Sequence, residues 1–243
     1  MDFFKKKYTA LELIEGQVFL IDKPLGWTSF QVVNKIRWHL KNQTGLKNLK
    51  VGHAGTLDPL ATGLLIICTG KKTKTISTLQ DSEKEYTGSF HLGATTPSYD
   101  QETEVNARYS INHINDEIIE RITKNFKGEI LQFPPVFSAL KKNGKRLYEY
   151  ARRGETPKIQ PRTIKISLFE ITYVRLPVVN FIVRCSKGTY IRSLAFDFGK
   201  ALNTGAYLIK LKRTKSGDYK IRDAFSMESV VNENSNEKIR KKA

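Results

Sequence analysis

The sequence predicts an α+β fold in which a mixed, largely antiparallel sheet is flanked by helices. Strand-like segments outnumber helical ones along the 243 residues, and the runs 164–174 and 178–184 are separated only by Arg175-Leu176-Pro177. Such a short connection is typical of an antiparallel hairpin. Hydrophobic residues make up 40% of the chain, which is enough for a core that a sheet and its helices can share.

The first expected elements lie on either side of a Lys-Pro turn. Residues 18–21 read as a strand that ends at Lys23-Pro24, and Thr28 or Ser29 can then cap a helix. Helical spacing places several side chains close to one face of this helix, namely Phe30, Val33, Ile36, Arg37 and Leu40. This face is expected to point into the core.

The later elements are predicted from the same periodicities. Asp116 can cap a helix that stops at Gly128. The other expected elements are strands at 64–68, 86–92 and 206–211 and a helix at 190–202. Two segments read as excursions from the core: the polar stretch 95–115, expected to be a long loop, and the stretch 133–162, which is rich in Pro, Lys, Arg and Tyr.

The charge of the chain predicts a polyanionic partner. Lysine and arginine number 41 against 24 acidic residues, a formal charge of +17, which favours nucleic acid or an anionic membrane surface. The apolar run 64–68 is far too short to span a bilayer, and the first residues do not form a secretory signal. The two cysteines, Cys68 and Cys185, lie in apolar segments, as expected for reduced thiols in a cytoplasmic protein.

The segment from Gly52 to Gly63 is the strongest indication of chemistry. It places the carboxylate of Asp58 in a glycine-rich turn, directly before the apolar run 64–68, and Pro59 biases Asp58 away from helical backbone angles. A carboxylate on a rigid turn can serve as a nucleophile. The spacing alone is equally compatible with an aspartate that only caps the turn.

Several motifs, in order along most of the chain, together resemble the bacterial TruB-type tRNA pseudouridine synthases. The Asp58 segment is similar to the signature loop of that family. The other matching motifs are Ile21-Asp22-Lys23-Pro24-Leu25-Gly26-Trp27-Thr28-Ser29, Lys84-Glu85-Tyr86, Pro134-Pro135-Val136-Phe137-Ser138-Ala139-Leu140-Lys141, Gly144-Lys145-Arg146-Leu147-Tyr148, Cys185-Ser186-Lys187-Gly188-Thr189-Tyr190-Ile191-Arg192, Gly205-Ala206-Tyr207-Leu208 and Leu211-Lys212-Arg213-Thr214. The resemblance implies the pseudouridine synthase fold.

The resemblance also implies the reaction, which is isomerisation of the uridine at position 55 in the TΨC loop of tRNA. It makes Asp58 the nucleophile on a flipped-out base, with Tyr86 and Arg192 as the other catalytic residues. It further implies that His53, Tyr190, Leu211, Lys23 and Pro24 form the substrate-binding residues. The alternatives are a synthase subunit directed by guide RNA and a non-catalytic tRNA-folding chaperone.

The resemblance divides the chain into a single catalytic domain, 1–231, and a basic tail, 232–243. The stretch 133–162 corresponds to a flexible RNA-binding insertion, and no C-terminal RNA-binding domain is expected. Phosphate contacts are predicted for the basic residues Lys141, Lys145, Arg146, Arg152, Arg153, Lys212 and Arg213.

The expected reaction is redox-neutral, and so we expect neither a metal nor a cofactor. The four histidines have no ligand spacing with one another or with either cysteine. The partner is expected to be the T stem-loop of tRNA, with no membrane contact and no obligatory protein partner. We expect a monomer.

Overall fold

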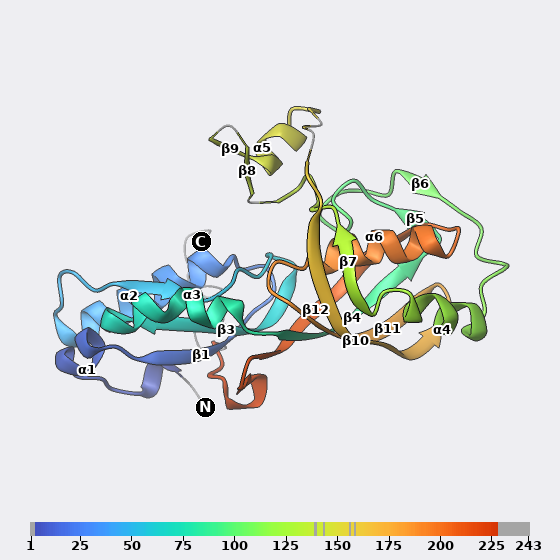
Figure 1. Cartoon of the computed structure of the whole chain (residues 1–243). Coiled ribbons are helices and arrows are strands. Elements are labelled where there is room, and N and C mark those ends of the chain that lie inside the picture. The colour runs from blue at the N-terminus through green and yellow to red at the C-terminus, as the bar shows by residue number, and fades with distance from the viewer. Residues whose placement is uncertain (1–2, 139, 143, 156, 158, 228–243) are drawn as a thin grey trace, which may run out of the picture. The chain divides into compact units, whose positions relative to one another are not determined.

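The computed structural model describes residues 3–138, 140–142, 144–155, 157 and 159–227. The chain divides into two compact units, one formed by Met1–Lys84 with Lys212–Ala243 and the other by Glu85–Leu211. Each unit is described separately below, with the element labels of Figure 1. The predicted basic tail 232–243 lies outside the described residues.

Unit 1 is built on β1 (Val18–Lys23) and β3 (Ala61–Thr69), which pair antiparallel along their length. The short β2 (Val51–His53) also pairs with β3, and the end of β12 (Ala206–Ser216) continues the sheet and pairs with β13 (Tyr219–Lys220). The helical elements of the unit are α1 (Ala10–Glu15), α2 (Ser29–Thr44), α3 (Ile76–Asp81) and the 3-10 turns at Phe3–Lys5, Gly70–Thr75 and Ile221–Asp223.

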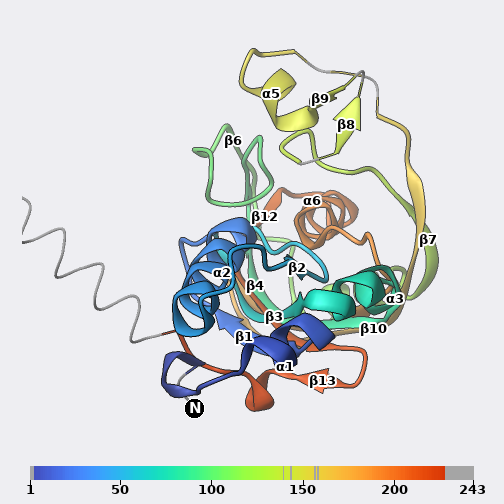
Figure 2. The ribbon, with the colours of Figure 1, turned by 90° about the vertical axis from the view of Figure 1, so that its left-hand side faces the viewer.

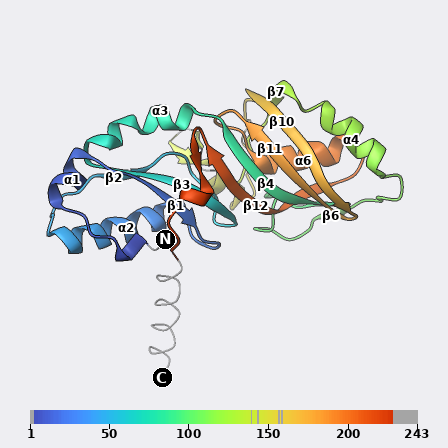
Figure 3. The same ribbon diagram turned by 90° about the horizontal axis from the view of Figure 1, so that it is seen from below.

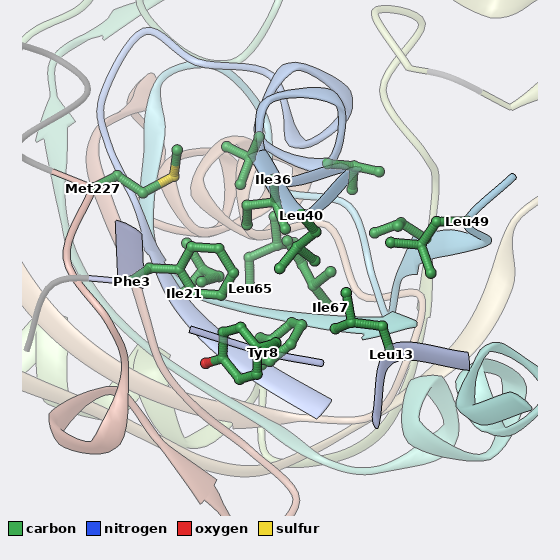
Figure 4. Packing of buried hydrophobic residues seen from close by; sticks show 14 residues of the cluster. Phe3, Tyr8, Leu13, Ile21, Ile36, Leu40, Leu49, Leu65, Ile67 and Met227 are labelled. Atoms are coloured by element: carbon green, nitrogen blue, oxygen red, sulfur yellow. The ribbon is translucent and has the colours of Figure 1, made fainter. Parts of the chain in front are cut away.

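The two faces of β3 bury different helices. Because successive side chains of a strand point to opposite faces, Leu65 and Ile67 pack with α2, whereas Leu64, Ile66 and Cys68 pack with Ile76 and Leu79 around α3. Figure 3 shows α2 and α3 on opposite sides of these strands. Figure 4 shows the larger cluster, in which side chains of α2 meet aromatic residues of the N-terminal segment.

Helix α2 begins as predicted but buries a different face at its start. Thr28 is the N-cap and forms a capping box with Gln31. Val33, Ile36 and Leu40 are buried as expected, whereas Phe30 is 66% exposed. The expectation for Phe30 was wrong because the buried stripe begins at Ser29 and runs through Val32.

Unit 2 carries the hairpin that the sequence predicted. Strands β10 (Arg162–Arg175) and β11 (Val178–Cys185) pair antiparallel, and β7 (Gly128–Gln132) pairs with the first part of β10. The strand order in this unit is β12, β4 (Lys84–Leu92), β11, β10 and β7. Together with a parallel bridge between Ile21 and Phe225 in unit 1, these pairings confirm a mixed, largely antiparallel sheet.

Two helices of unit 2 lie beside its strands (Figure 1). Helix α6 (Ile191–Ala201) buries Phe198 against an aromatic group that also contains Phe90, Phe169 and Phe181. Helix α4 (Asp116–Lys124) is capped by Asn115, whose side-chain oxygen accepts a hydrogen bond from the Ile118 N–H. The cap is thus one residue earlier than the predicted Asp116.

The two predicted excursions both contain short regular elements. The stretch 95–115 includes β6 (Ala107–Arg108), which pairs with β5 (Ala94–Thr95). The stretch 133–162 includes β8 (Lys141–Lys142), β9 (Lys145–Arg146) and α5 (Leu147–Ala151). Figure 2 shows these three elements as one small group beyond the ends of β7 and β10.

Candidate active site

The predicted nucleophile lies in a loop between two paired strands of unit 1. We call residues 54–60 the aspartate loop. Strand β2 pairs with β3 up to His53 and Ile67, and the Ala54 N–H donates to the Ile66 carbonyl at 2.9 Å. The loop therefore starts and ends on the sheet, and the side chain of Asp58 within it is half-buried.

Lys23 holds the aspartate loop from the side of the Lys-Pro turn. Its side chain is fully buried, and its ammonium donates to the carbonyls of Pro24 (3.0 Å), Trp27 (2.5 Å) and Pro59 (3.5 Å). An ammonium has three N–H donors, and all three carbonyls belong to the backbone. Lys23 was predicted as a substrate-binding residue, whereas the structure places its charged group inside the protein.

Arg213 holds the same loop from β12. Only 2% of this residue is exposed, and its guanidinium donates to the carbonyls of Leu64 (2.7 Å) and Gly55 (3.1 Å). A glycine is required at position 63, where φ is +102° and a Cβ atom would lie 2.4 Å from the Arg213 carbonyl oxygen. The predicted phosphate contact of Arg213 therefore differs from the structure, which buries its guanidinium.

A buried serine links the loop to α2. The Ser29 hydroxyl donates to the Leu57 carbonyl at 3.0 Å and accepts from the Leu57 N–H at 2.8 Å. The neighbouring Gly26 N–H donates to the Pro59 carbonyl at 2.9 Å. The residues on both sides of Asp58 are thus fixed through their backbone atoms.

The electrostatics of the loop follow from this burial. Burial lowers the pKa of Lys23 to about 8, while the nearby carboxylate of Asp58 acts in the opposite direction and Arg213 adds to the lowering. Burial, followed by the charge of Arg213, also lowers the pKa of His53. The lowered pKa favours the neutral form of the His53 imidazole.

Unit 2 contains a second buried polar group, which we call the arginine centre. Arg192, on the first turn of α6, is 4% exposed, and its guanidinium donates to the carbonyls of Phe137 (2.8 Å) and Ser98 (3.3 Å). Its Nε lies 3.6 Å from the Asp100 carboxylate. The other oxygen of that carboxylate accepts the Glu102 N–H at 2.9 Å. These contacts fix the Arg192 side chain within unit 2.

The loop beneath Arg192 has an unusual backbone. Tyr99, between Ser98 and Asp100, has a φ of +63° and stacks on Phe196 with ring centroids 4.2 Å apart. A non-glycine residue in this region is strained and persists only where the surroundings hold it. The strained residue thus lies between Ser98 and Asp100, the two residues of this loop that contact Arg192.

The predicted aromatic and apolar site residues of unit 2 are placed as follows. Tyr86 lies on β4 and Leu211 on β12, and both are buried. Tyr190 is the N-cap of α6, and its backbone N–H and carbonyl are both bonded to the side chain of Gln132. The Arg162 guanidinium lies 4.9 Å from the Tyr190 ring centroid, a cation–π distance that fixes the ring.

Most of the predicted phosphate-binding residues are exposed. In the stretch 133–162, Lys145, Arg146, Arg152 and Arg153 are open to solvent, and Lys141 forms part of β8. The guanidinium carbons of Arg146 and Arg152 lie 6.0 Å and 5.3 Å from the Tyr148 ring centroid. In unit 1, Lys212 is half-buried and lies 3.7 Å from the Asp22 carboxylate.

Sequence reasoning missed three residues of this site. Asp100 and Ser98 lie in the stretch 95–115, and the sequence offered one local signal for them, a run of Thr, Pro, Ser and Asp that is typical of side-chain-bonded turns. Arg162 precedes a predicted strand, and its contact with Tyr190 joins residues 28 positions apart. No local pattern predicts that contact.

Comparison with protein families assigns most of the chain. The model for the TruB family pseudouridylate synthase (N terminal domain) matches residues 41–191. The model for the tRNA pseudouridylate synthase B C-terminal domain matches residues 192–242. The chain belongs to the TruB family. The predicted family and the pseudouridine synthase fold are therefore confirmed.

Curated and solved relatives agree with TruB membership. The chain is 60% identical over 220 residues to the tRNA pseudouridine synthase B of Flavobacterium johnsoniae, covering 90% of this chain and 96% of that protein. It is 54% identical over 215 residues to the protein of the same name from Phocaeicola vulgatus, covering 88% and 92%. The names of these TruB relatives are those of enzymes, which agrees with the prediction that this chain is an enzyme.

A more distant solved structure resembles the chain in fold. A crystal structure of a Cbf5-Nop10-Gar1 complex contains a chain that matches with a TM-score of 0.67 and 31% identity over 91% of this chain. This TruB family member spans only 55% of that longer chain. Separately, none of the helices that the structure describes has the length and apolarity needed to cross a membrane.

Proposed function

We propose that this chain converts the uridine at position 55 in the TΨC loop of tRNA to pseudouridine, with Asp58 as the nucleophile. One observation carries the proposal: the backbone on both sides of Asp58 is fixed by the buried cations Lys23 and Arg213. A loop held in this way presents its carboxylate in one position, which is what nucleophilic catalysis requires. Membership in the TruB family supports the same reaction.

The reaction breaks the bond between the ribose and N1 of uracil, turns the base and joins the ribose to C5. The base gains and loses no electrons overall, so the protein has to supply only a nucleophile, a proton route and a means of holding the released base. Because a stacked base is out of reach, the uridine must be extruded at a cost of a few kcal/mol. In this proposal the neutral ring of His53 fills the space that the base leaves.

Catalytic and substrate-binding roles are also proposed for residues of unit 2. Tyr86 stacks on the extruded uracil, Tyr190 and Leu211 enclose it, and Arg192 orients the Asp58 carboxylate. The contacts of Arg192 with Asp100 and Ser98 support this role. They already fix the guanidinium, so that orienting a carboxylate costs Arg192 little further side-chain entropy. Lys23 and Pro24 contribute by shaping the loop beside Asp58.

The exposed cations of the stretch 133–162 and Lys212 are proposed to bind tRNA phosphates. We further propose that residues 1–231 act as one catalytic domain, that the enzyme works as a monomer in the cytoplasm and that it needs no protein partner. The guide-directed alternative is not favoured, since the bacterial relatives with 49–60% identity are named tRNA pseudouridine synthase B.

The direct test is incubation of the purified protein with unmodified tRNA, followed by mapping of pseudouridine at nucleotide resolution. We expect product at position 55 only, without an added guide RNA or partner. Asp58→Asn should lower the rate by more than about 1,000-fold and leave tRNA affinity within about threefold, since the amide keeps the shape of the side chain. The exposed Asp116→Asn on α4 is the matched control.

The outcomes separate the three readings of the sequence. Product elsewhere, or only with a guide RNA, would show a different specificity. A tRNA whose folding improves but which contains no pseudouridine would show a chaperone. A rate near that of the wild type for Asp58→Asn would remove Asp58 as the nucleophile.

A further inference from the structure

Three large apolar side chains lie in or next to the aspartate loop and are open to solvent. Leu25 is 64% exposed, Phe30 is 66% exposed and Leu60 is 38% exposed. We call these three residues the apolar rim. Single exposed apolar residues are ordinary on protein surfaces, but several at one functional loop mark a binding surface.

The hydrogen bonds of unit 1 bring the three residues to the same place. The Gly26 N–H donates to the Pro59 carbonyl, and each member of this pair has a rim residue as its neighbour, Leu25 before Gly26 and Leu60 after Pro59. The bonds between Ser29 and Leu57 form a second junction, and Phe30 follows Ser29. Both junctions lie within one residue of Asp58 along the loop.

The position of Phe30 is set by the helix cap. Thr28 caps α2 and Ser29 points inward to the loop, so Phe30 is directed away from the buried stripe of α2. The aromatic ring is therefore largely exposed at the first turn of the helix, directly after the serine that contacts the aspartate loop.

We propose that the apolar rim binds the unstacked bases next to the target uridine, with Phe30 stacking on one of them. This inference rests on the proposed function. Extruding a base leaves its neighbours in the loop without a stacking partner, and single-stranded RNA is recognised by stacking of such bases on aromatic side chains. The rim adjoins the loop that carries Asp58, and the charge of +17 favours an RNA occupant.

The test is a double-mutant cycle between the protein and a T stem-loop hairpin. Wild-type protein and Phe30→Ala are each titrated with the intact hairpin and with hairpins that lack the base on the 5′ or the 3′ side of the target uridine. Stacking is worth about 1–3 kcal/mol per base. Phe30→Ala should therefore weaken binding of the intact hairpin by about 5- to 150-fold, but by less than about twofold for one of the two abasic hairpins.

Two controls separate stacking from other effects. Trp38 is 58% exposed on the same helix, two turns further from the loop, and Leu11 is 70% exposed on α1, so Trp38→Ala and Leu11→Ala should leave affinity within about twofold. Phe30→Tyr should retain most of the affinity. The salt dependence of binding should keep its slope in Phe30→Ala, because no phosphate contact is lost.

Several results would overturn the inference. These are unchanged affinity in Phe30→Ala, an equal loss on the intact and both abasic hairpins, or a change in sedimentation that assigns the rim to a second copy of the chain. Failure of the proposed function looks different, since the wild-type protein would then form no pseudouridine in the intact hairpin. If the wild-type enzyme is active and Phe30→Ala binds the hairpin as tightly as the wild type does, only the inference about the apolar rim is rejected.

Discussion

The aspartate loop and the arginine centre are both built around buried cations, but the cations have different partners. In the aspartate loop, Lys23 and Arg213 donate to backbone carbonyls. In the arginine centre, Arg192 also faces the buried carboxylate of Asp100. The first arrangement fixes the path of the chain, and the second fixes one side chain.

This difference predicts how each region fails. A backbone carbonyl cannot be removed by substitution, so the loss of Lys23 or Arg213 takes a donor away from acceptors that remain in place. The loss of Arg192 leaves a buried charge, which a second substitution at Asp100 can remove. A second substitution should therefore restore stability in the arginine centre, whereas no second substitution can do so in the aspartate loop.

The largest effect is expected at the arginine centre. Arg192→Met should lower the free energy of unfolding by about 3–5 kcal/mol, because it leaves the carboxylate of Asp100 buried without its cation. The double variant Arg192→Met/Asp100→Asn should regain at least half of that loss, although it should stay inactive. Chemical denaturation of both variants measures this. If the double variant is less stable than the single one, the stability lost in Arg192→Met does not come from leaving the Asp100 carboxylate without its cation.

A smaller effect is expected for Arg213→Lys. Lysine keeps the charge but lacks the planar fork that spans the Leu64 and Gly55 carbonyls, so the free energy of unfolding should fall by about 1–3 kcal/mol. The single-turnover rate should fall while tRNA affinity stays within about threefold, because the guanidinium is buried. The neighbouring Lys212→Ala should show the reverse pattern, with weaker tRNA binding and little change in stability. If Arg213→Lys loses as much tRNA affinity as Lys212→Ala, Arg213 contacts RNA phosphates as the sequence predicted.

The smallest effect is a pH dependence that comes from Lys23. Its pKa is about 8 in the folded protein and 10.5 ordinarily, so between these values the unfolded chain binds more protons. Stability contributed at this position should therefore rise as the pH increases from 8 to 10.5. The difference in unfolding free energy between the wild type and Lys23→Met should widen over this range, with the exposed Lys71→Met as the control. A constant difference would show that Lys23 keeps its proton throughout.

Much of the fold could be predicted from local patterns. Alternation and apolar runs located β1, β3, β4, β10 and β11, and the three-residue connection predicted the hairpin. Thr28 or Ser29 was expected as a helix cap from residue type and position, and the structure has Thr28 in that role. The strand β12 runs to Ser216, beyond the expected end at residue 211. The expectation was too short because the last residues of the strand are mostly basic, and local hydrophobicity does not detect a strand whose charged side chains are buried by distant segments.

The sequence by itself indicated the TruB family through the resemblance of its motifs. It also located the loop that carries Asp58, because glycine and proline restrict or free the backbone over a few residues. Only the tertiary structure decided the surroundings of that loop. Arg213 reaches a carbonyl 149 positions away, and Arg192 reaches one 94 positions away. Whether a long basic side chain turns inward depends on acceptors that the fold assembles, and whether Phe30 turns outward depends on which neighbouring residue the loop already holds. Both are decided by contacts between distant segments, which no local pattern contains.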